Sequence, residues 1–416
     1  MRKILGRVVS KRNLKNGCFI DLICQANLQQ VFVPKKLNPS DILYGDILEI
    51  EGEDYQTKLN IPTIRVRQWT LCIRPRKVIR KKQQVNNIRR WYLNGLNNGD
   101  LIRCLKARST ILFKIRDFLI NHGFMEIETP ILEQTRGSMA ARPIETKTLR
   151  NGKSYVLKRS GETYHKRIIM STICDSFEIS RVFRDQGASR TTMAEYNMLD
   201  IYKIGASYLD VMDLLENLLS HLVVECQNIG VQLKHLQFPI PKISLVNFIE
   251  DTLQQDILLP DTDISKLRQR LKKLNVATSL PHNISKVQLF NWMYTNLVKP
   301  RIKQATFIYD FPNELCPLGK PKDDFFAEEF RLLIDGVNVA HGYTECTEID
   351  IQREALLQQY KNNKEKGLTV SLEEEFLESM EYGFPPMAGV GLGLDRFFAI
   401  VLGYPNVRHT KAFPFH

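Results

Sequence analysis

Two arginines that lie far apart in the chain are the strongest candidates for chemistry. Arg184 ends the apolar run Phe177–Arg184, and Arg396 follows the glycine-rich run Gly389–Asp395. We expect each arginine on a strand-like segment that holds its guanidinium rigidly inside a pocket. A guanidinium stays charged at any working pH, and its planar fork binds phosphate or carboxylate oxygens in pairs. A salt bridge within a sheet would explain either arginine alone. The pair, however, suits a nucleoside triphosphate, with one arginine at the reacting phosphate and the other at the far end.

The glycines before Arg396 support this interpretation. Gly389, Gly391 and Gly393 alternate, so they share one face of an extended strand. A strand face without side chains lets a ligand approach the backbone closely, while the residues between the glycines can face the core. No strand precedes a G-x-G-x-x-G turn here, so the run is not a dinucleotide-binding loop. Taken alone, the glycine run is a weak signal.

Residues 1–73 have the pattern of a small closed barrel of the oligonucleotide-binding (OB) type. Five short runs rich in β-branched and apolar residues are separated by turns rich in Lys, Asn and Gly; they cover residues 4–9, 18–23, 30–33, 47–51 and 63–67. Aromatic side chains on such a barrel can stack on bases, so Phe19 and Phe32, with Gln30 beside them, are candidate nucleic-acid contacts. The competing interpretation is that both rings belong to the core, which is the commoner fate of phenylalanine.

The formal charge of +12 lies entirely in the first 90 residues. Residues 1–73 carry 11 Lys and Arg against 7 Asp and Glu, residues 74–90 carry eight basic and no acidic residues, and the remainder carries 39 of each. A segregated basic patch is typical of a nucleic-acid binder. A solvated basic linker would also explain residues 74–90. The candidate contacts in that segment are Arg74, Arg76, Lys77, Arg80, Lys81 and Lys82.

The rest of the chain alternates helices and strands without the βαβ rhythm of a parallel sheet, which predicts an α+β domain with an antiparallel sheet flanked by helices. Residues 74–107 read as a basic linker or adaptor between the OB barrel of residues 1–73 and a domain of residues 108–416. Apolar spacing predicts helices from Ser109 to Asn121, at 208–225 and at 351–366, the last being the final helix before the glycine run. A strand is expected at 124–128, and a mostly helical insertion at 242–302.

Several protein classes are excluded by composition. No apolar run reaches about 18 residues, so no membrane span is expected, and the N-terminus does not have the pattern of a signal peptide. The eight cysteines are scattered singly. None forms a C-x-x-C pair, so neither a zinc site nor a disulfide framework is indicated. We therefore expect a cytoplasmic protein with reduced thiols.

Three motifs in order resemble those of class II aminoacyl-tRNA synthetases: residues 117–130 resemble motif 1, Phe177–Asp200 resembles motif 2 and Gly389–Arg396 resembles motif 3. The runs between them resemble the lysine-type subfamily; they are Ala141-Arg-Pro143, Gly161-Glu-Thr-Tyr-His-Lys-Arg167, Gly342-Tyr-Thr-Glu345 and Glu381-Tyr-Gly-Phe-Pro-Pro386. The resemblance covers nearly the whole chain, and its N-terminal part is similar to the anticodon-binding barrel of that subfamily.

The resemblance implies an adenylate-forming ligase that uses ATP to activate an amino acid and then transfers the acyl group to tRNA, without a covalent enzyme intermediate. Arg184 would bridge the amino-acid carboxylate and the α-phosphate, stabilising charge that develops in the reaction. Tyr196, next to Glu195, would stack on adenine. Arg396 would hold the γ-phosphate, with Gly393 beside it. Motif 1 usually builds a homodimer interface, so a homodimer is expected.

The resemblance also implies an amino-acid pocket. Glu162 would bind the α-amino group, and Tyr343 and Glu345 would line the side-chain pocket. A carboxylate buried at the end of this pocket pairs a cation that would otherwise lose its hydration, so Glu345 is expected to meet the ε-ammonium of a lysine substrate.

The chain departs from the family at several positions. Lysine-type enzymes hold Mg²⁺ with two glutamates, and this chain has Arg331 and Asn338 at those positions. Neither side chain can replace a bridging carboxylate. We therefore assign no metal ligand, and the use of Mg²⁺ stays open. Gln186 replaces a glutamate near adenine, His341 replaces an asparagine that contacts substrate, and the motif 2 loop reads Arg190-Thr-Thr-Met193. Either Arg331 supplies the positive charge of a metal, or the site has lost catalysis. Alternatively, Arg331 simply pairs with Asp335, Glu328 or Glu329, and His341 is a core histidine.

Three functions therefore remain open on the sequence. The first is a lysyl-tRNA synthetase-like ligase, for which the basic barrel supports tRNA as the acceptor. The second is a paralogue that transfers a lysine-like residue to a protein or small molecule. The enzyme that lysylates elongation factor P resembles this catalytic domain, including residues 340–345, but it lacks the barrel. The third is a catalytically silent module that binds RNA or an amino acid.

Overall fold

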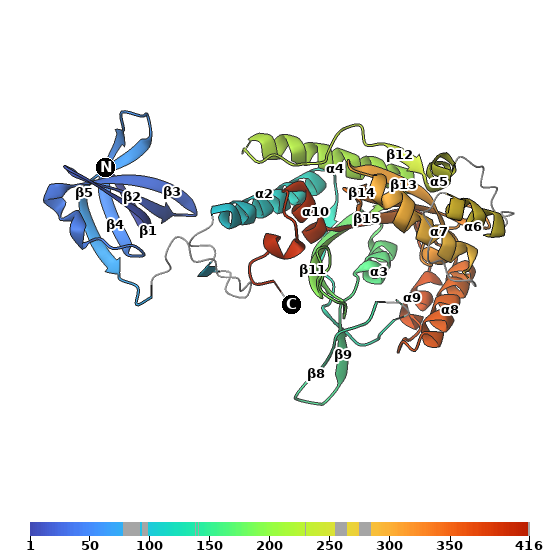
Figure 1. Ribbon diagram of the computed structural model, residues 1–416. Helices are drawn as coiled ribbons and strands as arrows, with labels where there is room; N and C mark the ends of the chain where they lie inside the picture. Colours follow the sequence, from blue (N-terminus) through green and yellow to red (C-terminus); the bar gives the residue numbers. More distant parts are fainter. Residues whose placement is uncertain are drawn as a thin grey trace. The chain divides into compact units, whose positions relative to one another are not determined.

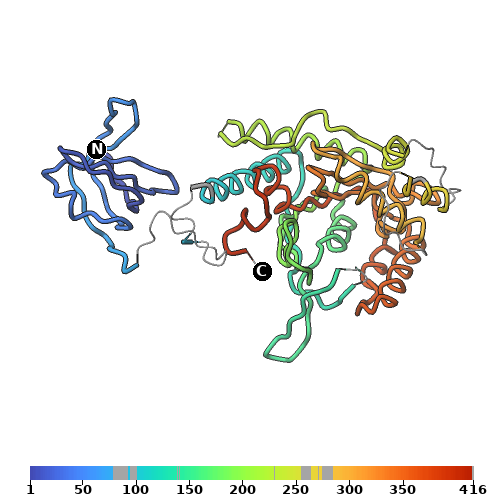
Figure 2. Tube along the Cα trace, viewed as in Figure 1, coloured from blue at the N-terminus to red at the C-terminus, as the bar shows by residue number. Residues whose placement is uncertain are grey.

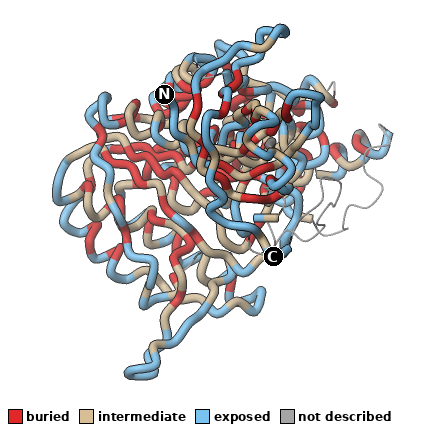
Figure 3. Tube along the Cα trace, turned by 90° about the vertical axis from the view of Figure 1, so that its left-hand side faces the viewer, coloured by how far each residue is buried: buried red, intermediate tan, exposed pale blue. Residues whose placement is uncertain are grey.

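The computed structural model describes residues 1–77, 92–93, 99–137, 139, 141–228, 230–253, 264–273 and 284–414. The chain forms two compact units (Figure 1). The first consists of Met1–Lys106 with Ala412–Pro414, and the second contains Ala107–Lys411. Each unit has its own apolar interior, where the buried residues gather (Figure 3).

The first unit contains a closed five-stranded barrel with the strand order β1-β2-β3-β5-β4, as the sequence predicts. Its strands are longer than predicted and span Arg2–Leu14 (β1), Gly17–Cys24 (β2), Asn27–Pro34 (β3), Ile47–Gln56 (β4) and Pro62–Ile73 (β5). Alternating residues fill the interior, among them Cys18 and Ile20 on β2 and Val31 and Val33 on β3. Because side chains alternate along a strand, the residues between them face outward.

The second unit is built on an eight-stranded sheet with the order β12-β13-β14-β15-β16-β11-β10-β6. The six strands from β13 to β10 pair antiparallel, as predicted, whereas the edge strands β12 and β6 pair parallel with their neighbours. The strands span Met125–Glu126 (β6), Ser176–Phe183 (β10), Glu195–Ile204 (β11), Lys242–Ser244 (β12), Thr306–Pro312 (β13), Phe326–Ile334 (β14), Val337–Thr344 (β15) and Met387–Gly393 (β16). A small separate sheet contains Leu132–Glu133 (β7), Glu145–Lys147 (β8) and Ser154–Leu157 (β9).

Three helices supply most of the apolar cover on one face of the large sheet: α2 (Gly99–Asn121), α4 (Tyr208–Asn228) and α10 (Leu394–Val401). The helix α2 begins ten residues before the predicted Ser109 and ends as predicted, because Gly123 adopts a φ of +86° that favours glycine. A buried ion pair of 2.6 Å between Arg108 on α2 and Asp395 on α10 fixes these helices to each other.

The other face of the sheet carries α3 (Glu162–Thr172), α8 (Ile349–Glu365) and α9 (Glu374–Met380), whose course can be followed in Figure 2. These helices share an apolar cluster with Tyr202 and Met387. The described part of residues 242–302 begins with β12 and continues as α5 (Leu245–Leu253), α6 (Ile264–Lys273) and α7 (Lys286–Met293). These helices have a core of their own, which packs on β13 and β14.

Two expectations about the C-terminal elements are wrong. The helix α9 lies between α8 and the glycine strand, so the predicted helix at 351–366 is not the last before it. Arg396 does not lie on a strand but in the first turn of α10. The strand β16 ends at Gly393, and the apolar side chains of Leu394, Phe397, Phe398 and Val401 then recur at helical spacing and are buried. Arg184 follows β10 directly.

Two composition-based expectations concern membranes and cysteines. Among the described residues, no helix has the length and apolar character needed to cross a bilayer. The eight cysteines all lie in described segments and are all free thiols.

Candidate active site

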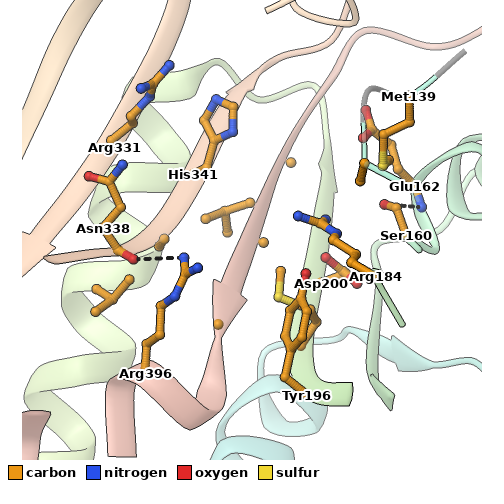
Figure 4. A pocket seen from close by; sticks show the side chains of 18 of the residues that line it. Met139, Ser160, Glu162, Arg184, Tyr196, Asp200, Arg331, Asn338, His341 and Arg396 are labelled. Carbon is orange, nitrogen blue, oxygen red and sulfur yellow. Dashed lines mark hydrogen bonds between the residues drawn. The ribbon is translucent and has the colours of Figure 1, made fainter. Parts of the chain in front are cut away.

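A cavity of about 500 Å³ opens on the face of the large sheet that carries α3 (Figure 4). Its walls come from β11, β14, β15, β16, α3, α8 and α10, together with loops between these elements. Of the site residues predicted in the second unit, only Glu195 does not line it; Glu195 instead pairs with Arg181 at 3.1 Å. The predicted residues that line it are Glu162, Arg184, Gln186, Tyr196, Arg331, Asn338, His341, Tyr343, Glu345, Gly393 and Arg396.

The two arginines that motivated the sequence interpretation share this cavity and lie on either side of the glycine strand (Figure 4). Arg184 donates from Nη2 to the carbonyl of Arg159 at 3.2 Å, and its guanidinium carbon lies 5.6 Å from the centroid of the Tyr196 ring. Arg396 donates from Nε to the carbonyl of Thr191 at 2.8 Å and from Nη1 to that of Asn338 at 3.3 Å. Backbone carbonyls therefore hold both cations in place without neutralising them.

The glycine strand β16 forms the bare floor between the two arginines, as the sequence predicts. A Cβ atom at Gly389 would lie 2.5 Å from the Tyr202 ring, and one at Gly391 would lie 2.9 Å from Met198. Side chains at these positions would fill the cavity, so only glycine leaves room for a ligand against the backbone.

The neighbouring strand β11 supplies cavity residues that the sequence analysis missed. Met198, Asp200 and Tyr202 line the cavity and lie opposite Gly393, Gly391 and Gly389. Leu199 and Ile201, between them, belong to the core on the other face. The period of two residues is visible in the sequence, but it becomes informative only once β11 is known to pair with the glycine strand.

Asp200 is a buried acid beside the floor of the cavity. Its pKa is raised to about 7, chiefly by burial and also by the negative charges of Glu178 and Glu162, against the opposing charges of Lys158 and Arg184. Its Oδ2 atom has no hydrogen-bond partner among the described residues. A cation bound in the cavity would therefore stabilise the ionised form of Asp200.

One end of the cavity contains a buried cluster of two carboxylates and an ammonium. Nζ of Lys166 lies 2.9 Å from Oε1 of Glu162 and also contacts Oε2 of Glu345. The hydroxyl of Tyr343 donates to the same Glu162 oxygen. Glu162 and Lys166 are four residues apart on α3, and that spacing places them on one helix face. The sequence analysis gave Lys166 no role, although this spacing is visible in the run Gly161–Arg167.

The charges in this cluster influence one another strongly. Burial would lower the pKa of Lys166, but the carboxylates of Glu162 and Glu345 raise it above its ordinary value. The pKa of Glu345 is raised to about 8, because burial and the charge of Glu162 outweigh the opposing Lys166 ammonium. The contact between Nζ and Oε2 favours the ionised pair. Oε1 of Glu345, which has no hydrogen-bond partner among the residues described, can accept from a further cation.

The positions where the family is expected to hold Mg²⁺ do not fit that ion here. Nε of Arg331 donates to Oε1 of Glu329 at 2.9 Å, and its guanidinium carbon stacks 4.0 Å from the centroid of the Phe311 ring. Oδ1 of Asn338 already accepts from the hydroxyl of Tyr294. Mg²⁺ prefers carboxylate oxygens and water in an octahedron, so an arginine and an engaged amide do not provide a site. Arg331 pairs with Glu329, one of the three expected carboxylates, and still lines the cavity.

His341 and Gln186 both reach the cavity. The His341 side chain is 43% exposed, so the expectation of a core histidine is wrong, and its Nε2 lies 2.8 Å from Oε1 of Glu329. Gln186 donates from Nε2 to the carbonyl of Met193 at 2.8 Å, which fixes the motif 2 loop.

On the barrel, four side chains form a strip across neighbouring strands, which we name the outer strip: Arg12, Phe19, Phe32 and Arg65. Each residue is the direct cross-strand partner of the next, on β1, β2, β3 and β5. The two rings lie 5.1 Å apart and are half-buried, while both arginines are exposed. The core interpretation of Phe19 and Phe32 is therefore wrong. A strip of cations and aromatic rings suits single-stranded nucleic acid.

The other predicted contacts of the barrel differ in their surroundings. The amide of Gln30 donates to Asp21 and accepts from the hydroxyl of Thr63 at 3.0 Å. Arg74 forms a 3.0 Å ion pair with buried Asp46, which explains it as a structural residue of the barrel. Arg76 and Lys77 are exposed. Arg80, Lys81 and Lys82 lie outside the described residues.

Comparison with known proteins places this geometry in a family. The family model of tRNA synthetases class II (D, K and N) matches residues 84–416. The chain is 29% identical to a lysine–tRNA ligase of Buchnera aphidicola subsp. Cinara cedri over 432 residues, which cover 99% of this chain and 86% of that protein. It is also 29% identical to the lysine–tRNA ligase of Coxiella burnetii over 436 residues, with the same coverage. A lysine–tRNA ligase of Staphylococcus epidermidis is 28% identical over 433 residues, or 99% of this chain and 87% of that protein. The chain belongs to the class II tRNA synthetases (D, K and N).

Proposed function

We propose that this aminoacyl-tRNA ligase activates lysine with ATP and transfers it to tRNA. The observation that carries the proposal is the composition of one cavity. Two unneutralised arginines, Arg184 and Arg396, lie on either side of a bare glycine strand, and buried carboxylates lie at one end. The arginines and the glycine strand suit a triphosphate, and the carboxylates suit a cationic amino acid. Relatives named lysine–tRNA ligase, matched over 99% of this chain, agree with that reading.

In the proposed reaction, an oxygen of the lysine carboxylate attacks the α-phosphorus of ATP and pyrophosphate leaves. The guanidinium of Arg184 binds the attacking carboxylate and the α-phosphate, and so stabilises the negative charge that develops between them. Arg396 holds the γ-phosphate, and the ring of Tyr196 stacks on adenine. A hydroxyl of the terminal ribose of tRNA then attacks the acyl carbon, its proton passes to the phosphate of the departing AMP, and AMP leaves. Arg184 acts by charge alone, so the step needs no protein acid or base.

The amino acid is proposed to bind at the carboxylate end of the cavity. Glu162 and Asp200 lie on the side of Arg184, where they suit the α-ammonium (Figure 4). Oε1 of Glu345, to which no described residue hydrogen-bonds, suits the ε-ammonium. For the triphosphate, Arg331 supplies positive charge where the family is expected to use carboxylates and Mg²⁺, and nearby Lys299 adds to it.

The two alternative functions gain no support from these observations. The matched relatives cover the barrel as well as the second unit, and a protein-lysylating paralogue would lack that barrel. The cavity also retains its cationic groups, which a silent module would not need.

ATP–pyrophosphate exchange with each standard amino acid, followed by tRNA charging, tests which of the three functions is correct. No exchange with any amino acid would favour the silent module, and exchange without charging would favour another acceptor. A tRNA substrate would place the protein in the cytoplasm.

Replacing Arg184 tests the reacting end of the cavity. Arg184→Ala should lower ATP–pyrophosphate exchange by roughly 10²–10³-fold, the loss typical when one group that stabilises transition-state charge is removed. Arg181→Ala is the matched control, since Arg181 precedes it on β10 with a side chain that is 65% exposed and paired with Glu195. Near-normal exchange by Arg184→Ala would show that the active site is wrongly assigned.

The raised pKa of Asp200 predicts a pH dependence of lysine binding. Below pH 7 the carboxyl is neutral, and above it the carboxylate attracts the substrate ammonium, so the KM for lysine should fall as pH rises from 6 to 8. The expected change is up to about tenfold, equivalent to one pKa unit. Asp200→Asn should flatten the profile, whereas Asp213→Asn, at a side chain that is 62% exposed, should not. Equal slopes in wild type and Asp200→Asn would contradict the assignment.

The outer strip should bind tRNA. Phe32→Ala should weaken tRNA binding by about 1–3 kcal/mol, the usual contribution of one stacked base. Arg65→Ala should lower the slope of log affinity against log salt by about one unit. Neither change should alter adenylate formation. Arg2→Ala is the control, because Arg2 lies on the same barrel and pairs with exposed Asp54. Unchanged tRNA affinity in both strip variants would refute this role.

The expected homodimer remains a proposal that rests on motif 1, residues 117–130. Sedimentation velocity over a range of protein concentrations measures the mass directly. A species of twice the 48.2 kDa chain mass is expected. A monomer at every concentration would contradict it.

A further inference from the structure

Three potential metal ligands, from one loop and two neighbouring strands, converge at the wall of the cavity. A thiol sulfur of Cys316, a carboxylate oxygen of Glu329 and an imidazole nitrogen of His341 all lie within 4.8 Å of one another. Cys316 and Glu329 are buried, and both Cys316 and His341 line the cavity. No sequence motif indicates this cluster, because its members lie 13 and 12 residues apart and form no C-x-x-C pair.

The backbone fixes these three residues in position. Glu329 on β14 and His341 on β15 project from the same face of the sheet, since Arg331 is the direct partner of His341 and alternate residues share a face. Cys316 precedes a loop that is attached to the end of β15. There the backbone amide of Cys346 donates to the carbonyl of Leu318 at 3.1 Å, and Gly319 forms a β-bridge with Glu345.

The carboxylate of Glu329 has one engaged and one available oxygen. Oε1 accepts from Nε of Arg331 at 2.9 Å and lies 2.8 Å from Nε2 of His341. Oε2 is buried and lacks a hydrogen-bond partner among the residues described. Buried polar atoms are normally satisfied. This oxygen, in a cluster with an imidazole and a thiol, indicates an occupant.

We propose that Cys316, Glu329 and His341 bind a Zn²⁺-type transition-metal ion whose fourth coordination position opens into the substrate cavity. Thiolate, imidazole and carboxylate are zinc ligands, and three protein ligands with one open position are typical of a zinc ion that contacts substrate or water. Bond lengths of about 2.0–2.3 Å bring the ligand atoms to roughly 3–4 Å from one another, which small side-chain rotations achieve here. Mg²⁺ does not suit a thiolate and an imidazole.

Charge and outer contacts fit the same ion. Metal binding releases the thiol proton of Cys316 to solvent. The thiolate and the Glu329 carboxylate then neutralise the two charges of the ion, so the positive charge of Arg331 remains as the net charge of the site. Arg331 then holds the ligating carboxylate through Oε1, which is the usual arrangement around a metal ligand. His341 and Arg331 lie next to each other at the cavity wall (Figure 4). The competing interpretation is a triad of Arg331, Glu329 and protonated His341 without metal.

Cobalt substitution in the full-length protein tests the site without relying on activity. After removal of metals by a chelator, Co²⁺ should bind at one ion per chain. It should give the visible absorption of tetrahedral cobalt and a thiolate-to-cobalt charge-transfer band, and Zn²⁺ should displace it. Cys316→Ser should abolish the charge-transfer band. His341→Gln should weaken Co²⁺ binding by more than the roughly 10–100-fold expected for a residue outside the ligand set.

Two controls keep the result interpretable. Cys72→Ser removes an exposed thiol of the barrel and should leave the cobalt spectrum unchanged, which excludes binding by a surface cysteine. His341→Gln changes a half-exposed side chain, so it answers the question even where Cys316→Ser fails to fold. A weak octahedral spectrum, a spectrum unaltered by both ligand variants, or no retained metal would overturn the proposal.

Discussion

The cavity depends on the two-residue alternation of the antiparallel strands at the centre of the large sheet. On β11, Leu199 and Ile201 pack into the core while Asp200 and Tyr202 face the ligand side. On β16, the residues that face the ligand side are glycines. A slip of one residue in pairing would exchange the two faces. The helices α2, α4 and α10 bury the apolar face and so hold the register that places Asp200 beside the glycine floor of the cavity.

Ion pairs and hydrogen bonds join the charged side chains of the cavity into networks. Lys166 contacts two carboxylates, Glu329 contacts Arg331 and His341, and backbone carbonyls hold Arg184 and Arg396. An isolated buried charge is unfavourable, and removing one member of a pair leaves the other uncompensated. The networks therefore keep the ligand-binding groups in fixed positions before any ligand arrives. Preorganised charge of this kind is what electrostatic catalysis requires.

Much of this arrangement could be predicted from the sequence, and the failures have physical causes. The motif arginines, the bare glycine face and the barrel followed from local patterns. The position of Arg396 on a helix did not, because a strand and a helix with the same apolar residues look alike over a short run. Lys166 and Asp200 were missed because their role depends on which strands and helices become neighbours. The same is true of Cys316 and Glu329, whose spacing of 13 residues matches no metal-binding motif. Phe19 and Phe32 were ambiguous until the barrel fixed which face of each strand is outside.

The presence of Lys166 inside the amino-acid end of the cavity has a consequence for selectivity. Its single positive charge offsets only one of the two carboxylates that it contacts, Glu162 and Glu345. One negative charge is left over, and ionisation of Asp200 adds a second. Under the proposed function, the two ammonium groups of lysine match these two charges in number. An uncharged side chain of equal length would leave a buried carboxylate uncompensated. The uncompensated negative charge of the cavity would therefore disfavour such an amino acid even where its shape fits.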